Sequence, residues 1–190
     1  MGNTGYSSSL NGVTVTIGGM AAPLVFVSPN QINAQVPFEV APGPQQVIVK
    51  TASGSSTAYN VTVAAVAPAL FFDAVGGSVI KNSDYSLVRP DNPLHAGDVA
   101  LVYLTGLGQT SPELKTGEFT TSTVLSNATT PIQVSVGGVN ATVVYSAASP
   151  GFAGLYQIAF EVPAGFPAGN VPLMVTAGGV ASNVVSIAVQ

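Results

Sequence analysis

Residues 31–63 read QINAQVPFEVAPGPQQVIVKTASGSSTAYNVTV, and residues 157–189 read QIAFEVPAGFPAGNVPLMVTAGGVASNVVSIAV. The two stretches align without a gap at a constant shift of 126 residues. The identical positions include a glutamine, a proline and a serine, namely Gln31 and Gln157, Pro37 and Pro163, and Ser56 and Ser182. Because strand, turn and proline positions keep one register, the alignment indicates two copies of one folding unit rather than one continuous sheet.

Most of the chain alternates apolar and polar residues. Residues 13–17, 132–136 and 156–162 place β-branched or aromatic side chains at every second position, a period that predicts half-buried strands. Residues 99–104 (VALVYL) are apolar on both faces, which predicts a central strand covered on two sides. Gly-Gly pairs, which allow the positive φ of tight hairpins, occur between strands at 18–19, 137–138 and 178–179. Since no window has the 3.6-residue period of a helix, the sequence predicts an all-β chain.

The duplication predicts two tandem immunoglobulin-like β-sandwiches. Residues 65–190 fit a complete sandwich of short strands, with an extended, irregular loop at 73–98. Residues 1–64 offer about five strands and lack the first strands of the other copy, which predicts an incomplete sandwich with exposed sheet edges and one exposed apolar face. Three structures could cover these edges and this face: the second module, a segment upstream of residue 1, or a strand from another molecule.

Several motifs carry a resemblance to a known family. They are VTVTIGG (13–19), SPNQINAQVP (28–37), TGLGQTSPELKTGE (105–118) and GLYQ (154–157). Together they resemble the C-terminal module of secreted acidobacterial (Solibacter-type) proteins, and each half is similar to the wider IPT/TIG group. The resemblance covers residues 10–190 and implies a pair of immunoglobulin-like sandwiches in a secreted or cell-surface protein. The chain departs from this family in lacking the usual upstream strand.

Composition excludes several classes of function. Of the 190 residues, 47% are apolar and 6% charged, and only four are Lys or Arg, too few to neutralise a nucleic-acid backbone. The absence of Cys excludes disulfides and thiolate metal sites. Neither a membrane-spanning stretch nor a signal-peptide pattern is evident. A β-rich chain with Ser, Thr, Asn and Gln in place of charges is typical of exported modules, so we expect a secreted or cell-surface location.

Candidate catalytic groups are few. His95 is the only histidine, and no G-x-S-x-G nucleophile motif occurs. Two pairs of carboxylates were considered for glycoside hydrolysis: Glu39 with Glu161, which are expected in separate modules, and Glu113 with Glu118, which share one turn region. We expect no catalysis and no cofactor.

The 73–98 loop contains acidic residues whose oxygens suit Ca²⁺. Asp84, Asp91 and Asp98 are the candidate ligands, although no known calcium-loop spacing is present. A second possibility is an amide crosslink between a lysine, Lys50 or Lys81, and an Asn or Asp side chain, promoted by a buried carboxyl.

The sequence therefore favours a non-enzymatic structural or adhesion module that acts as a spacer, an anchor or a protein-interaction domain. One alternative is a carbohydrate-binding module that uses Tyr85 and Tyr6 as exposed stacking platforms, with Tyr103, Tyr145 and Tyr156 expected in the core. The other is self-assembly, in which the incomplete sandwich accepts a strand from a neighbour. The expected partners are proteins or polysaccharides at the cell surface.

The remaining motif residues are assigned to the fold. Gly106, Gly108 and Gly154 are expected where the backbone adopts conformations that a Cβ would penalise. Gln31 and Gln157 are expected to bridge backbone groups at the edge of each module, near the prolines Pro37 and Pro163.

Overall fold

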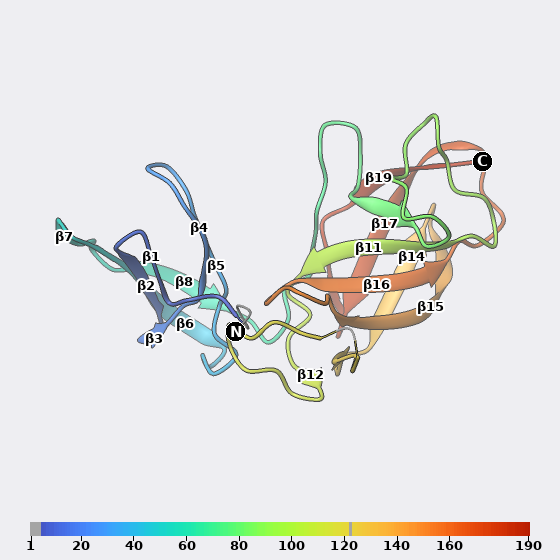
Figure 1. Ribbon diagram of the computed structural model, residues 1–190. Helices are drawn as coiled ribbons and strands as arrows, with labels where there is room; N and C mark the ends of the chain where they lie inside the picture. The colour runs from blue at the N-terminus through green and yellow to red at the C-terminus, as the bar shows by residue number, and fades with distance from the viewer. Residues whose placement is uncertain (1–4, 122) are drawn as a thin grey trace. The chain divides into compact units, whose positions relative to one another are not determined.

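The computed structural model describes residues 5–121 and 123–190 (Figure 1). Every regular element in this part is a strand, which confirms the all-β prediction. The described part contains no helix long and apolar enough to cross a membrane. The chain divides into two compact units. Unit 1 comprises Met1–Ala65, Pro112–Ser126 and Ser149–Gly154, and unit 2 comprises Val66–Ser111, Asn127–Ala148 and Leu155–Gln190.

Unit 2 contains an eleven-stranded antiparallel sheet whose main path runs β10-β11-β16-β15-β14-β17-β18. Its strands are β9 (Ala69–Leu70), β10 (Val79–Lys81), β11 (Val99–Thr105), β12 (Thr110–Ser111), β13 (Asn127–Ala128), β14 (Ile132–Val136), β15 (Val139–Ala148), β16 (Tyr156–Glu161), β17 (Gly169–Ala177), β18 (Val180–Ala181) and β19 (Val185–Val189). β14 pairs with both β15 and β17, which makes the sheet continuous from β10 to β18, and the sheet is curled into a half-barrel.

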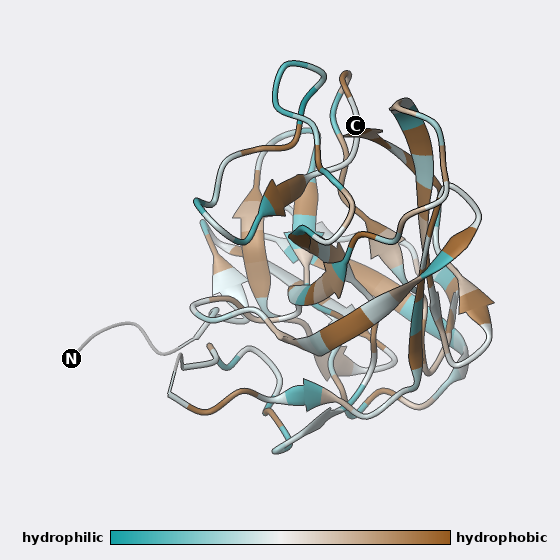
Figure 2. Cartoon of the chain, turned by 90° about the vertical axis from the view of Figure 1, so that its right-hand side faces the viewer, coloured by the Kyte–Doolittle hydropathy of each residue, from teal (hydrophilic) through white to brown (hydrophobic). Residues whose placement is uncertain are grey.

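The core of unit 2 lies on the inner face of this sheet. Val102 and Leu104 of β11 and Ile158 and Phe160 of β16 are completely buried, and apolar residues follow the strands (brown in Figure 2). β11 lies between β10 and β16, as the pattern of residues 99–104 predicted for a central strand.

The segment 73–98 is more ordered than the predicted loop. It contains β10, whose Ile80 bridges Leu87, and its Leu94 is buried and bridges Val189 of β19. Apolar residues at these positions dock the segment onto the sheet, although β10 is its only regular strand.

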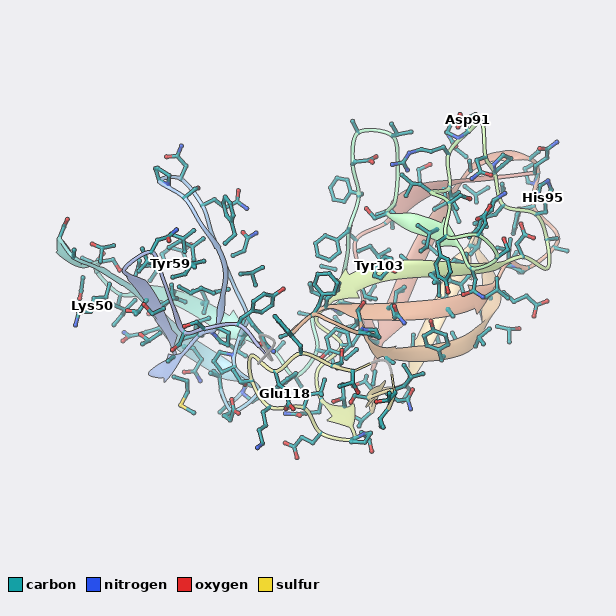
Figure 3. All side chains as sticks on the ribbon, in the orientation of Figure 1. Lys50, Tyr59, Asp91, His95, Tyr103 and Glu118 are labelled. Carbon is teal, nitrogen blue, oxygen red and sulfur yellow. The ribbon has the colours of Figure 1, made fainter. Side chains whose placement is uncertain are left out.

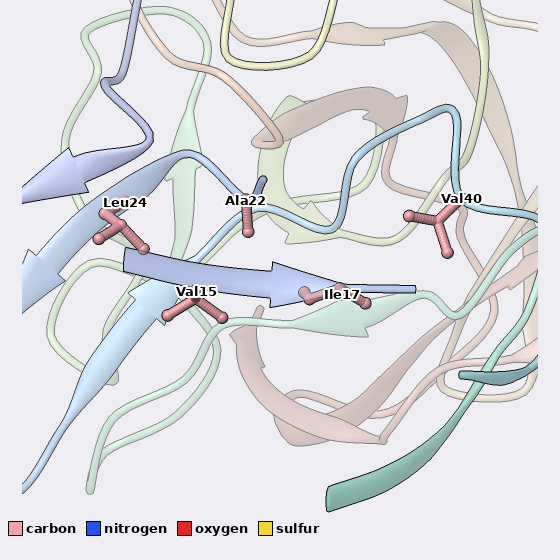
Figure 4. Close-up of a cluster of buried hydrophobic side chains, with 5 residues drawn as sticks. All are labelled: Val15, Ile17, Ala22, Leu24 and Val40. Carbon is pink, nitrogen blue, oxygen red and sulfur yellow. The ribbon is translucent and has the colours of Figure 1, made fainter. Parts of the chain in front are cut away.

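Unit 1 contains a six-stranded sheet and a separate two-stranded ribbon. The sheet consists of β1 (Ser9–Leu10), β2 (Val13–Ile17), β3 (Met20–Ala21), β6 (Gly43–Thr51), β7 (Gly54–Ser55) and β8 (Tyr59–Val63), and the ribbon of β4 (Leu24–Val27) and β5 (Ile32–Ala34). Five buried side chains form its core: Val15, Ile17, Ala22, Leu24 and Val40 (Figure 4). Val15 and Ile17 lie two residues apart on β2 and therefore face the same side.

The two copies have matching strands. β6, β7 and β8 coincide with β17, β18 and β19 at the 126-residue shift. The recurring serine has the same role in each copy: Ser56 Oγ accepts from the backbone N–H of Val49 (3.1 Å), and Ser182 Oγ accepts from that of Val175 (3.0 Å). The duplication inferred from the sequence is therefore present in the strands and in their turn hydrogen bonds.

Unit 1 includes two segments that lie within the second repeat of the sequence. Gln35 Oε1 accepts from the backbone N–H of Gly117 (2.8 Å), and Thr116 Oγ1 accepts from that of Phe38 (2.9 Å). The Gly117 carbonyl accepts from the backbone N–H of Tyr6 (2.9 Å). The predicted domain 65–190 is continuous in sequence, whereas compact unit 2 leaves out these two segments.

Candidate functional site

The outer face of the unit 2 sheet carries polar aromatic side chains. Tyr103 of β11 is paired in register with Gln157 of β16, and Tyr145 of β15 is paired with Ala159. Directly paired residues of antiparallel strands project to the same face, and successive residues alternate between faces. Tyr103, Tyr145 and Gln157 therefore share the face opposite the buried Ile158. Figure 3 labels Tyr103 on β11.

Tyr103 and Tyr145 lie on this face with Gln157. The Gln157 Nε2 amide donates to the Tyr145 hydroxyl at 3.1 Å. Burial raises the pKa of the Tyr145 hydroxyl, and the nearby hydroxyls of Tyr103 and Tyr85 raise it further. We call Tyr85, Tyr103, Tyr145 and Gln157 the tyrosine face. It combines aromatic rings with hydroxyl and amide groups that can donate and accept hydrogen bonds.

Tyr85 is presented by a tight turn after β10. Its side chain is 70% exposed and its φ is +58°, a left-handed conformation that is uncommon for a bulky residue. Its backbone N–H donates to the Lys81 carbonyl (2.9 Å). Asp84 Oδ1 accepts from the backbone N–H and the hydroxyl of Ser86 (2.9 and 2.7 Å), and these hydrogen bonds hold the pKa of Asp84 below its usual value. The turn thus leaves the Tyr85 ring exposed to solvent.

The other predicted platform is placed differently. Tyr6 is half-buried in unit 1, with its ring edge-on to Phe119 at a centroid distance of 4.7 Å. The expectation that Tyr6 is exposed is therefore wrong, because the 112–126 segment packs against it. Sequence reasoning also missed the exposure of Tyr59 on β8 (72%) and of Phe72. Of the three tyrosines expected in the core, Tyr156 is buried and donates to the Gly108 carbonyl, whereas Tyr103 and Tyr145 are half-buried.

The three candidate calcium ligands are not brought together. Asp84 caps its own turn, Asp98 Oδ2 accepts from the backbone N–H of His95 (2.8 Å), and Asp91 is exposed (Figure 3). Asp73, which the sequence did not single out, has the same capping role for Val75 and also pairs with Arg89. Within residues 5–121 and 123–190, no three His, Asp or Glu side chains are close enough to hold a metal ion.

The candidate catalytic groups are likewise dispersed. His95 is exposed, with Nδ1 3.6 Å from Asp98 Oδ2. Glu39 accepts from the Thr116 hydroxyl (2.6 Å) in unit 1, whereas Glu161 ends β16 in unit 2. The other pair, Glu113 and Glu118, lies in the 112–126 segment of unit 1.

An amide crosslink from a lysine needs a buried carboxyl group nearby, and the described residues do not provide one. Lys50 is exposed on β6 and Lys81 is half-buried on β10. All eight acidic residues lie in the described part, and seven are exposed while Asp98 is half-buried. A buried carboxyl, which would hold the proton needed for the condensation, is therefore not available to either lysine.

The glycine motifs act on the backbone, as expected. Gly106, Gly108 and Gly154 all have positive φ, at +80°, +79° and +75°. A Cβ on Gly106 would overlap with the carbonyl oxygen of Ala67, whose own N–H donates to the Gly106 carbonyl (2.8 Å). The first proline of the Val-Pro pairs, Pro37, is buried and its carbonyl accepts from Val40, whereas Pro163 is half-buried.

The glutamine prediction is wrong for Gln31. Gln31 is exposed, and its Nε2 donates to the Asn33 side chain (2.7 Å) rather than to a backbone group. Gln157 bonds to the Tyr145 hydroxyl. Gln35 is buried and reaches a distant backbone group, the N–H of Gly117. Gln35 alternates with the apolar residues Ile32, Ala34 and Val36, and no local signal shows the segment that covers it.

Comparison with known families supports the fold. Residues 4–64 match the model of the IPT/TIG domain, which confirms the IPT/TIG part of the resemblance for the first repeat. No finding supports the narrower acidobacterial module. No curated protein matches the chain.

Proposed function

We propose, from the IPT/TIG domain at residues 4–64, that this chain is a non-catalytic adhesion or spacer module of an exported protein. The IPT/TIG domain is an immunoglobulin-like domain typical of non-catalytic surface and extracellular modules. The observation that carries the proposal is that three of the aspartate side chains accept hydrogen bonds from the backbone of their own turns. Asp73, Asp84 and Asp98 each cap a turn of their own, which stabilises local backbone rather than forming a reactive centre.

The composition of the surface supports a binding role. Only 6% of the residues are charged, and uncharged polar groups are cheaper to desolvate on binding than ions. Unit 1 also exposes Val25, Phe26 and Val36 at and near its β4–β5 ribbon. Exposed apolar side chains that lie near one another are typical of surfaces that bind other macromolecules.

The exported location is tested on intact cells of the source organism. Antibodies against the purified chain are expected to label unpermeabilised cells, or to detect the protein in the culture medium, while a cytosolic marker is detected only after lysis. Detection of this protein only after lysis would contradict the proposal.

A second candidate function is carbohydrate binding at the tyrosine face. Sugar rings present C–H groups that pack on aromatic rings and hydroxyls that pair with polar side chains, and the tyrosine face offers both kinds of partner. The observation that favours this role is that Tyr103, Tyr145 and Gln157 share one sheet face, with the Gln157 amide hydrogen-bonded to the Tyr145 hydroxyl, while Tyr85 is exposed in the turn after β10.

Replacing the exposed ring tests this candidate. If the full chain binds a polysaccharide or an arrayed glycan, Tyr85→Ala is expected to weaken that binding at least about tenfold, since loss of an aromatic hot-spot contact costs about 2 kcal/mol or more and about 1.4 kcal/mol corresponds to tenfold. Tyr59→Ala is the matched control, because Tyr59 is equally exposed (72% against 70%) but lies in unit 1. Equal losses in both variants, or binding unchanged by Tyr85→Ala, would exclude the tyrosine face as the site.

A further inference from the structure

Equivalent positions of the two copies differ in burial. Val162, which follows β16, is 1% exposed, whereas its equivalent Val36, which follows β5, is 46% exposed. Ile158 and Phe160 are completely buried, whereas their equivalents, Ile32 and Ala34 of β5, are only partly buried. The first copy therefore has the apolar residues of a buried strand, but no neighbouring strand in the described part of unit 1 buries them to the same extent.

The second copy shows what covers this strand. β11 pairs with the whole length of β16, with Val99 opposite Glu161 and Leu104 opposite Tyr156. The residues before β11 continue the pairing, because the backbone N–H of Val162 donates to the Asp98 carbonyl (2.8 Å) and that of Gly97 donates to the Val162 carbonyl (2.9 Å). In unit 1, β5 pairs with β4 and with no other strand of the described part.

A second edge differs in the same way. The outer edge of β19 is paired with the 73–98 segment: the backbone N–H groups of Gly77 and Leu94 donate to the carbonyls of Ser186 (2.8 Å) and Ala188 (3.0 Å). Its equivalent, β8, pairs with β6 alone among the described strands. One continuous stretch, residues 66–105, thus covers both edges in the second copy, and the described residues of unit 1 contain no equivalent stretch.

The segments that complete unit 1 do not replace this cover. Residues 112–126 reach Gln35 and Phe38, which lie beyond the end of β5. They leave β5 itself with one paired edge, and Val36 exposed. An open edge beside apolar side chains is a template for an incoming strand.

We propose that β5 is an acceptor edge for an extended apolar strand of a partner polypeptide, which adds antiparallel to β5 with the side-chain pattern of β11. This inference rests on the proposed binding role and specifies the ligand as an extended apolar peptide strand. By the register of the second copy, the partner residue equivalent to Val102 lies opposite Ile32 and faces the unit 1 core, and the next residue, equivalent to Tyr103, faces outward. The β11 strand of a second copy is not available as the donor, because it is largely buried and paired with β10 and β16 in its own unit 2.

The test uses the full chain and a fluorescein-labelled peptide with the sequence of residues 97–107, GDVALVYLTGL. Saturable binding is expected by fluorescence anisotropy, together with slowed amide exchange in residues 31–36. The peptide with Val102→Asp is expected to bind at least tenfold more weakly, because the charge faces the core. The peptide with Tyr103→Asp is the neighbouring control, and its affinity is expected to change by less than threefold.

A matched pair of chain variants locates the site. Val36→Asp is expected to weaken peptide binding at least tenfold, whereas Val180→Asp, at a valine of similar exposure (44%) in unit 2, leaves it unchanged. No saturable binding, equal effects of the two peptides, or equal effects of the two chain variants would overturn the proposal. Dimers in light scattering whose 31–36 amides are already slow to exchange would also overturn it, because the donor would then be a second copy. If the protein is exported but does not bind the peptide, only the acceptor-edge proposal is contradicted. If the protein is cytosolic but binds the peptide, only the proposed role as a module of an exported protein is contradicted.

Discussion

Replacing Gly106 by alanine is expected to destabilise unit 2 by about 3 kcal/mol. A non-glycine residue at a φ of +80° costs about 1–2 kcal/mol. The new Cβ would also overlap with the Ala67 carbonyl oxygen, a backbone atom. The two segments would have to move apart and lose the hydrogen bond from Ala67 N–H to the Gly106 carbonyl, which adds about 1–2 kcal/mol. Urea unfolding followed by circular dichroism measures the change.

Gly138→Ala is the control for this substitution. Gly138 lies in the same unit at a φ of +84°, and a Cβ there would meet no atom within 4 Å. Its replacement is expected to cost about 1 kcal/mol, from the backbone conformation alone. If the two variants lose the same stability, the close approach of Ala67 is not what requires glycine at position 106.

Removing the side-chain amide of Gln35 is expected to destabilise unit 1 by about 2 kcal/mol. Its Oε1 is the buried acceptor for the Gly117 N–H (2.8 Å), and a buried donor left without a partner costs about 1–3 kcal/mol. Gln35 also packs close to Gly154, whose added Cβ would lie 3.1 Å from Gln35 Cγ. Gln35→Ala removes both the hydrogen-bond acceptor and the packing against Gly154, so both losses contribute to the decrease in stability. Urea unfolding measures this decrease.

Two further variants separate these contributions. Gln35→Met keeps most of the packing volume and lacks the amide, so it is expected to retain most of the destabilisation. Gln31→Ala removes an exposed amide that bonds to Asn33, and its effect is expected to stay within about 0.5 kcal/mol. A Gln35→Met protein as stable as the wild type would show that the hydrogen bond to Gly117 does not hold the 112–126 segment in place.

Local sequence patterns were sufficient for the strands and not for the segments between them. β11 and the matching strands of the two copies follow from apolar period and from the 126-residue shift, because each strand carries its own face pattern. The 112–126 segment has few regular apolar positions, and its place in unit 1 depends on contacts with residues about 80 positions earlier, such as Gln35. Such contacts are fixed by tertiary packing and leave no periodic signal.

The tyrosine face was predictable in part. The exposure of Tyr85 follows from its position in a polar turn. Tyr103 and Tyr145 were assigned to the core because their strands are apolar, but each lies in the outward phase of its strand. The pairing that places Tyr103, Gln157 and Tyr145 on one face depends on the register of three strands, and the bulge between Val143 and Tyr145 shifts that register by one residue.

The assembly of unit 1 from three separate segments has a consequence for folding during synthesis. Residues 112–126 and 149–154 leave the ribosome long after residue 65. At about 5–20 residues per second, the first repeat waits roughly 4–18 s for the last of them. During that interval the Gln35 amide and the Tyr6 ring lack the neighbours that residues 112–126 and 149–154 later provide. A chaperone or a strand of another protein can therefore bind the N-terminal repeat before these segments of the same chain do.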